Sequence, residues 1–193
     1  MNKTRLEAFS DGVIAIIITI MVLELKPPHG SDWQLLRDLV PKFISYIISF
    51  IYVAIYWNNH HHLLHTVKHV TGAILWSNTH LLFWISLMPF VTAWAGENHF
   101  AALPVAAYSF ILLMAAIAYF ILSKTIISVH GKGSLLSTAI GNDLKGIVSM
   151  IGYATAVPLA FYYREGSIAI IAAIAVLWLV PDRRIEKKVN ENE

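Results

Sequence analysis

The sequence predicts an all-α integral membrane protein, a bundle of six transmembrane helices with almost no soluble mass. Of its 193 residues, 57% are hydrophobic and 13% are charged, about half the charged fraction of an ordinary soluble domain. No Asp, Glu, Lys or Arg occurs between Lys68 and Glu97, or between Glu97 and Lys124. Each stretch exceeds the roughly 20 residues that a helix needs to cross a bilayer core. A soluble helix would instead show a charged face.

Six apolar segments divide the chain, and we expect each to cross the membrane once. Asp11 interrupts the first segment, which argues against a cleavable signal peptide. Pro89 and Pro158 lie inside segments, where neighbouring helices can satisfy the carbonyls that a proline leaves free. The expected spans are residues 9–25, 43–65, 72–95, 101–123, 146–163 and 167–180, forming one domain over residues 1–181 with a short tail over residues 182–193.

The basic residues predict the orientation of these spans. Ten of the 14 Lys and Arg residues lie on the side that holds both termini, and four lie in the loops on the other side. Loops rich in Lys and Arg stay in the cytoplasm. We therefore expect a multi-pass protein of the cell membrane with both termini cytoplasmic. Trp33, Trp57 and Trp178 are expected to anchor the helices at the membrane interfaces.

The composition also argues against several function classes. A formal net charge of +2 and the lack of a long basic run disfavour a nucleic-acid partner. Cysteine is absent, so the sequence offers no thiol chemistry, disulfide or thiolate metal site. It contains no carboxylate pair, H-E-x-x-H or G-x-S-x-G motif. We therefore expect neither an enzyme nor a bound cofactor.

The first segment is the least lipid-like of the six, because Asp11 and Glu24 bracket its short uncharged core. Ionisable groups at membrane depth are costly and usually face protein or a water-filled cavity. We therefore expect this helix to sit inside an assembly. Four of its residues recur at i, i+3, i+4 and i+7 and share one face of the helix: Ile16, Thr19, Ile20 and Leu23.

Repeated around a symmetry axis, this face would form stacked rings along a central path. Rings of bulky aliphatic side chains can close a pore by excluding water, and the Thr19 hydroxyls could contact a dehydrating cation. Glu24, at the outer end, could concentrate cations as a ring of carboxylates, or it could equally be solvated or paired with Lys26. The alternative is that the aliphatic residues of this face are ordinary packing residues.

The start of this helix resembles a known signature. Arg5, Phe9, Ser10 and Asp11 follow the pattern R-x-x-x-F-S-D before an Ile-rich helix. This pattern is similar to the signature of the transmembrane protein 175 family, the endolysosomal potassium channels and their bacterial homologues. The six-span layout agrees, so the resemblance covers the whole chain. It implies a potassium-selective channel whose first helix lines the pore, without a looped carbonyl filter such as T-V-G-Y-G, which this sequence lacks.

The resemblance also implies roles for single residues and an assembly. Ile16 corresponds to the family's isoleucine or leucine constriction, and Thr19 to a threonine layer of some members, near which a permeant potassium ion would pass. Ile20 and Leu23 correspond to aliphatic pore layers in others. A chain with one six-helix repeat resembles the bacterial form, a homotetramer, whereas animal members carry two repeats and form dimers. A closed four-fold ring also suits one pore helix per chain.

A polar cluster at the cytoplasmic end of the second span is expected at the level of the signature. Its members are Asn58, Asn59, His60, His61, His62 and His65. In the family a network that includes a second-helix histidine holds the pore helix in place. By resemblance, we expect His60 or His61 to join Arg5, Ser10 and Asp11 in such a network.

Other interpretations of the polar residues stay open. The cluster could be an interfacial polar belt, or a metal site built from His61, His65 and His69, although no carboxylate accompanies these residues. The histidines could also make gating or stability sensitive to pH. Asn78 and His80, inside the third span, are expected to make hydrogen bonds between helices.

A secondary transporter is the main rival to a channel. Transporters often show internal pseudo-symmetry and interrupted helices near the midplane of the membrane. No internal repeat is visible in this sequence, while Pro89 and Pro158 give weak support to interrupted helices.

Overall fold

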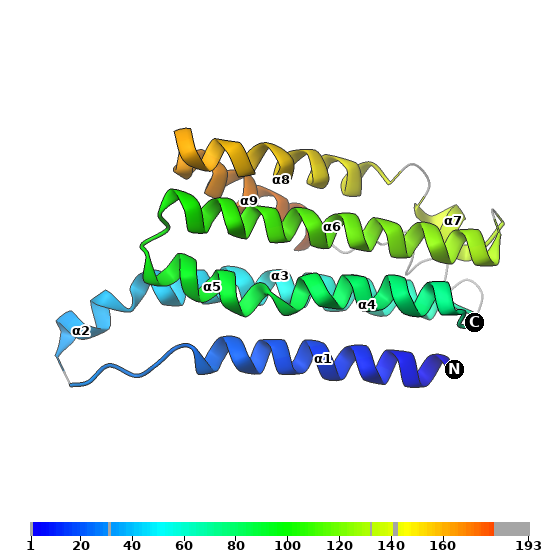
Figure 1. The fold of residues 1–193 in the computed structure, drawn as a ribbon, viewed down its shortest axis with the longest axis horizontal. Helices are drawn as coiled ribbons and strands as arrows, with labels where there is room; N and C mark the ends of the chain where they lie inside the picture. The colour runs from blue at the N-terminus through cyan, green and yellow to red at the C-terminus, as the bar shows by residue number, and fades with distance from the viewer. Residues whose placement is uncertain (1, 31, 132, 141–142, 180–193) are drawn as a thin grey trace.

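Helices make up all the regular secondary structure in the computed structural model, which describes residues 2–30, 32–131, 133–140 and 143–179. The long helices lie side by side, with α1 at one edge of the bundle and α8 at the opposite edge (Figure 1). In chain order the helices are α1 (Lys3–Leu23), α2 (Trp33–Asp38), α3 (Val40–His65), α4 (Gly72–Ser86), α5 (Met88–Glu97), α6 (Ala102–His130), α7 (Leu135–Ile140), α8 (Leu144–Tyr162) and α9 (Arg164–Leu179). The all-α prediction is confirmed for these residues.

Five stretches of the described chain are long and apolar enough to cross a membrane. They overlap the first five predicted spans and are bounded by Lys3–Leu23, Trp33–His65, Gly72–Glu97, Ala102–His130 and Leu144–Tyr162. α9 occupies the sixth predicted segment with 16 residues and packs against α8, α6 and α3. A sixth crossing by α9 stays a prediction, because residues 180–193, which include the expected tail, lie outside the described residues.

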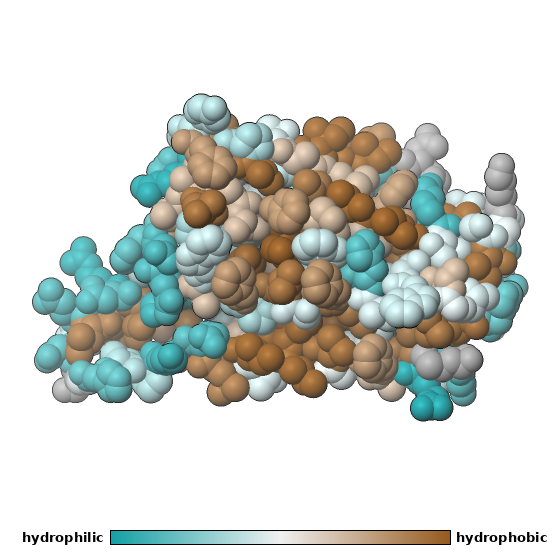
Figure 2. Space-filling model, viewed as in Figure 1, coloured by the Kyte–Doolittle hydropathy of each residue, from teal (hydrophilic) through white to brown (hydrophobic). Residues whose placement is uncertain are grey.

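The surface of the bundle fits this assignment. Hydrophobic side chains cover its middle, and hydrophilic ones gather towards its ends (Figure 2). Aliphatic side chains in the middle of helices are widely exposed: Ile151 and Val176 are 62% and 64% exposed. Lipid would cover such residues along the length of the helices, while water would solvate the ends.

α1 begins earlier than the predicted first span because its N-terminus is capped. The side chain of Asn2 accepts a hydrogen bond from the backbone N–H of Thr4 at 3.3 Å, which satisfies one of the free donors of the first turn. The helix ends at Leu23, shortly before Pro27 and Pro28, since proline cannot continue a helical hydrogen-bond ladder. The whole signature therefore lies within the helix.

The third predicted span is two helices rather than one. α4 ends at Ser86 and α5 begins at Met88. Pro89 has no N–H to donate to a carbonyl one turn earlier, and its ring disfavours a straight continuation of the helix. A proline alone does not predict this break, because Pro158 lies inside α8, which continues past it.

One face of α3 carries buried polar side chains. Ser45, Ser49, Tyr52, Tyr56 and Asn59 recur every three or four residues and point into the bundle. Ser45 donates to the carbonyl of Thr92 at 2.6 Å, and the hydroxyls of Ser49 and Tyr108 lie 2.7 Å apart. Such hydrogen bonds help to hold helices together where lipid offers no hydrophobic driving force.

The backbones of α3 and α5 approach closely at Gly96. A Cβ atom at this position would lie 2.9 Å from the Cα of Lys42. Small residues at such contacts let membrane helices pack tightly. The same end of the two helices is joined by an ion pair between Lys42 and Glu97, with 3.0 Å between Nζ and Oε1.

Candidate functional site: the first helix and its anchors

The two faces of α1 have different surroundings. Leu6, Ser10, Ile14, Ile17 and Met21 recur every three or four residues and are buried against the rest of the chain. α1 packs with this face on α3, α4 and α5. The helix is therefore fixed to its own bundle along one side only.

The four predicted pore residues lie on the other side of α1. Ile16 is 59% exposed, Ile20 is 42% exposed and Leu23 is 69% exposed. Thr19 is also exposed, and its hydroxyl donates to the carbonyl of Ala15 at 2.9 Å. This face points away from the rest of the chain, so a single chain does not enclose a path along it.

A buried hydrogen-bonded chain connects α1 with α3 and α4. Asn78 Nδ2 donates to Ser10 Oγ at 2.9 Å, and His60 Nε2 lies 2.6 Å from Asn78 Oδ1. Because an amide oxygen only accepts, His60 carries a proton on Nε2 and donates. Ser10 in turn donates to the carbonyl of Leu6 at 2.9 Å. Each of these three side chains is at most 1% exposed.

Asp11 is held from α3 as well. Trp57 Nε1 donates to Asp11 Oδ1 at 2.9 Å. Trp57 is 47% exposed, so it keeps the partial exposure expected of an interfacial anchor while also binding the signature carboxylate. The structure therefore brings Ser10 and Asp11 to the second span through Asn78 and Trp57, neither of which sequence analysis assigned to the network.

The remaining predicted members do not join this network. Arg5 is exposed and Phe9 is 55% exposed, and among the described residues neither has a hydrogen bond or ion pair from its side chain to α3. His61 is exposed, and its ring lies 6.4 Å from that of Trp57. Of the two candidate histidines, the structure brings only His60 to Ser10 through hydrogen bonds.

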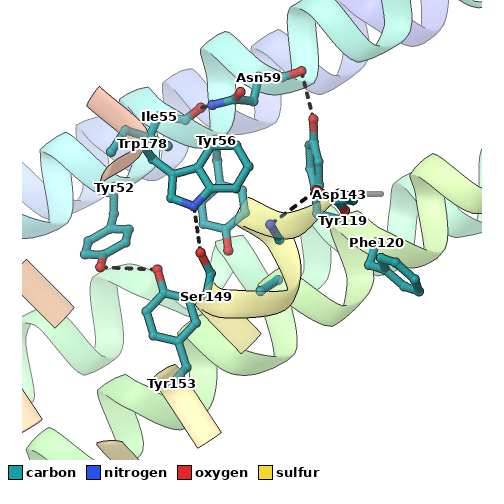
Figure 3. Close-up of a pocket in the computed structure, with 12 residues that line it drawn as sticks. Tyr52, Ile55, Tyr56, Asn59, Tyr119, Phe120, Asp143, Ser149, Tyr153 and Trp178 are labelled. Carbon is teal, nitrogen blue, oxygen red and sulfur yellow. Dashed lines mark hydrogen bonds between the residues drawn. The ribbon is translucent and has the colours of Figure 1, made fainter. Parts of the chain in front are cut away.

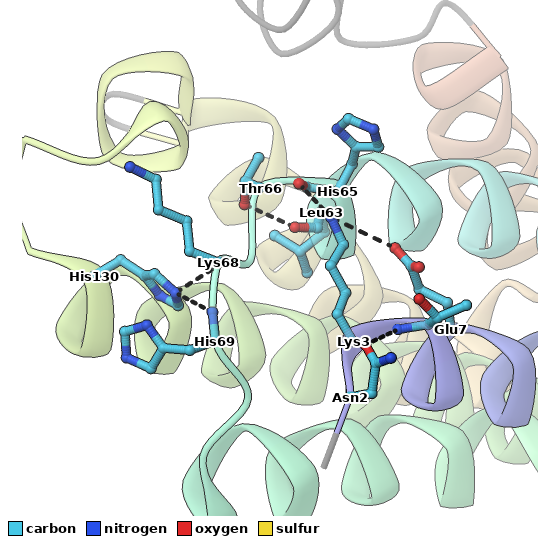
Figure 4. A network of polar contacts seen from close by, with 10 residues as sticks. Asn2, Lys3, Glu7, Leu63, His65, Thr66, Lys68, His69 and His130 are labelled. Carbon is cyan, nitrogen blue, oxygen red and sulfur yellow. Dashed lines mark hydrogen bonds and ion pairs between the residues drawn. The ribbon is translucent and has the colours of Figure 1, made fainter.

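A second contact ties the start of α1 to the end of α3 (Figure 4). Lys3 Nζ donates to the carbonyl of His65 at 2.8 Å and lies 3.8 Å from Glu7 Oε1. Sequence analysis did not single out Lys3 or Glu7, although their i, i+4 spacing is the usual one for an ion pair on a helix.

The histidines do not share one face, as a metal site on His61, His65 and His69 would need. α3 ends at His65, so the i+4 spacing no longer holds for His69. The ring of His69 instead lies 4.6 Å from that of His130 on α6. In the part of the chain that the structure describes, no three His, Cys, Asp or Glu residues are grouped to hold a metal ion.

Glu24 lies at the other end of α1, beside an open groove of about 500 Å³ between α1 and α5. Glu97 lies on the same groove, although its carboxylate is paired with Lys42. Glu24 is exposed and lines this groove, and among the described residues no ion pair joins it to Lys26.

A small cavity lies away from α1 (Figure 3). It holds about 40 Å³ between α3, α6, α8 and α9. Tyr153 donates to the Tyr52 hydroxyl at 3.2 Å, and Trp178 Nε1 donates to Ser149 Oγ at 2.8 Å. The aromatic walls of this cavity thus belong to the packing of the four helices and are separate from the exposed face of α1.

Comparisons with known proteins agree with the signature. The family model of the endosomal/lysosomal potassium channel TMEM175 matches residues 5–89. A potassium channel of Chryseobacterium sp. (strain P1-3) is 56% identical over 192 residues, which cover 100% of both chains. The endosomal/lysosomal proton channel TMEM175 of Homo sapiens is 33% identical over 101 residues, which cover 46% of this chain and 20% of the human protein.

The fold gives the same result. The crystal structure of a lysosomal potassium-selective channel TMEM175 homolog from Chamaesiphon minutus superimposes with a TM-score of 0.79 at 27% identity. The match covers 93% of this chain and 97% of that chain. Similarity in sequence and in fold therefore extends over nearly the whole protein. The chain is a member of the TMEM175 potassium channel family.

Proposed function

We propose that four copies of this chain form a potassium-selective channel in a bacterial cell membrane, with α1 of each copy lining a central pore. The observation that carries the proposal is the division of α1 into a buried, anchored face and an exposed face with Ile16, Thr19, Ile20 and Leu23. Two proteins similar to this chain, from Chryseobacterium and Chamaesiphon minutus, are named as potassium channels. A pore helix needs two such faces, one bound to its own subunit and one free to face the pore axis.

Layers of aliphatic side chains would control the passage of ions through the pore. Around a four-fold axis the exposed side chains of Ile16, Ile20 and Leu23 would form three layers. Narrow apolar layers exclude water and so hinder the passage of hydrated ions. Permeation would be passive, would need no cofactor and would involve no enzymatic reaction.

Thr19 would offer the polar contact between these layers. Its hydroxyl proton is used by the carbonyl of Ala15, so the oxygen keeps a lone pair free to accept or to coordinate. Four such oxygens facing the axis could replace part of the hydration shell of a potassium ion. Glu24, near the outer end of the same helix, would attract cations to the mouth.

Two sets of hydrogen bonds would hold α1 at a fixed depth and rotation. One is the network of Ser10, Asn78 and His60, and the other is the bond from Trp57 to Asp11. A rotation of α1 would move the exposed face away from the axis. We also propose six spans with both termini in the cytoplasm, from the excess of basic residues on that side. The start of α1 is then the cytoplasmic end of the pore.

Flux measurements on the purified protein in liposomes test the proposal. The wild type is expected to pass potassium electrogenically and in preference to sodium, without a coupling ion. Ile16→Ala should widen the constriction and raise sodium flux relative to potassium flux. Ile151→Ala on α8 is the matched control, because Ile151 is 62% exposed against 59% for Ile16 and lies on a different helix.

Two results would contradict the assignment. An unchanged ion preference in the Ile16→Ala channel would exclude Ile16 as the constriction. Flux that saturates and depends on a second ion would instead identify a secondary transporter, for which the break between α4 and α5 would be the relevant feature.

A further inference from the structure

A histidine side chain at the end of α6 contacts the turn between α3 and α4 (Figure 4). His130, the last residue of α6, places its Nε2 atom 3.1 Å from the backbone nitrogen of Lys68 and 3.4 Å from that of His69. Its other ring nitrogen, Nδ1, lies 3.0 Å from the carbonyl oxygen of Ile126, one turn earlier in α6.

These contacts determine which ring nitrogen donates and which accepts. Nε2 faces two backbone N–H groups, so it can only act as an acceptor and carries no proton. Nδ1 then carries the proton and donates to Ile126. A neutral imidazole has one donor and one acceptor, and both are used here. A protonated imidazolium would direct a second N–H at two donors, with no acceptor between them. Protonation of Nε2 would therefore remove both hydrogen bonds to the turn.

Two titratable side chains of the turn lie beside His130, those of Lys68 and His69. The rings of His69 and His130 lie 4.6 Å apart. α7, which also packs against α6, has the sequence LLSTAI and adds no titratable group.

The turn is connected to the start of α1. It follows directly on His65, whose carbonyl accepts the hydrogen bond from Lys3. Thr66 and Val67, the first residues of the turn, are 8% and 2% exposed, so the turn is packed and not merely tethered. A displacement of the turn would therefore move one of the groups that anchor the cytoplasmic end of α1.

We propose that His130 is a pH-sensitive clamp, whose neutral ring docks the turn at residues 66–71 on α6 and whose protonation releases it and loosens the anchor of α1. Because Nε2 can accept from Lys68 and His69 only when it carries no proton, the proposal predicts that both hydrogen bonds form at higher pH and are lost at lower pH. The effect on ion flux rests on the proposed function, whereas the release of the turn does not.

Hydrogen exchange of the purified full-length protein in lipid nanodiscs measures the clamp directly. Protection factors, corrected for the intrinsic effect of pH, are compared at about pH 8 and about pH 5.5, on either side of the usual histidine range. The amides of Lys68 and His69 should lose protection about fivefold at the lower pH, as expected when hydrogen bonds of ordinary strength are lost. Exchange in the first turn of α1 should rise with it.

His130→Gln supplies the decisive variant. Its side-chain oxygen can accept from the same N–H groups but does not titrate, so the turn should stay protected at both pH values. His29→Gln, in the loop before α2, is the matched control and should keep the wild-type response. Equal protection of the wild-type turn at the two pH values would overturn the proposal, and so would a full pH response in His130→Gln. Release of the turn with no change in α1 would overturn the connection to the pore helix.

Potassium flux separates this proposal from the proposed function. A pH response of flux that is lost in His130→Gln supports both. If the protein passes no potassium but the turn is released as described, the clamp stands and the channel assignment fails. If potassium passes selectively and the turn does not respond to pH, the clamp fails and the channel assignment stands.

Discussion

Ser10 of α1 and Asn78 of α4, 68 residues apart in the sequence, are joined by a buried hydrogen bond of 2.9 Å. The same Asn78 side chain accepts from His60 on α3. One amide thus connects three helices at the level of the signature. A buried network of this kind is stabilising only when every member has its partner.

Asn78→Leu is expected to destabilise the folded protein. The substitution leaves the His60 donor buried without an acceptor and removes the donor to Ser10, and the expected cost is about 1–3 kcal/mol. Thermal unfolding in detergent should show a lower Tm. Thr79→Ala is the control, since Thr79 is exposed and its hydroxyl binds only the carbonyl of Leu75 in its own helix. An Asn78→Leu protein as stable as the Thr79→Ala protein would show that the network does not hold α1.

Gly96→Ala should separate α3 from α5. The added methyl group would lie 2.9 Å from the Cα of Lys42, and backbone atoms cannot move aside as the end of a side chain can. Overpacking of this kind costs roughly 1–3 kcal/mol, which unfolding experiments would detect. Gly72→Ala is the matched control, because a Cβ atom there meets nothing within 4 Å. Equal stability of the two variants would mean that the close approach tolerates a side chain.

Thr19→Val tests the polar layer proposed for the pore. Valine keeps the shape of threonine but lacks the hydroxyl, and the substitution removes one such oxygen from each of the four subunits. Potassium flux relative to sodium flux should therefore fall at least about fivefold, the factor that corresponds to roughly 1 kcal/mol for a single lost hydrogen bond or ligand. Thermal stability should not change, since Thr19 is exposed in the single chain.

The control for this variant is Thr155→Val on α8. Thr155 is also exposed, and its hydroxyl donates to the carbonyl of Ile151 at 2.8 Å, as that of Thr19 does to Ala15. Its flux ratio should equal that of the wild type. A similar loss of selectivity in both variants would place the effect outside the proposed pore.

The choice between His60 and His61 shows what a sequence pattern leaves open. Successive residues of a helix point about 100° apart, so one of two adjacent histidines can face the bundle while the other faces out. The two residues are of the same type and occupy adjacent positions, so the hydropathy profile does not distinguish them. Only the packing of α3 against α1 and α4 decides that His60 is buried at 1% exposure and that His61 is exposed.

Asn78 and Trp57 could not be assigned to the signature network from the sequence for a related reason. Asn78 was expected to form a hydrogen bond between helices, and the structure confirms this, but a partner 68 residues away has no local signal. Likewise, the end of α3 at His65 moves His69 off the helical face and places its ring beside His130.

The sequence alone indicated the membrane class, the approximate positions of five apolar stretches long enough to cross a membrane and the residues of α1 that share one face. These depend on the thickness of the bilayer and on the helical repeat, which act on short stretches of chain. The tertiary structure decided which polar side chains meet Ser10 and Asp11, where α4 and α5 separate, and that His130 holds the turn after α3. Each of these depends on contacts between helices that are distant in the sequence, and no local pattern encodes such contacts.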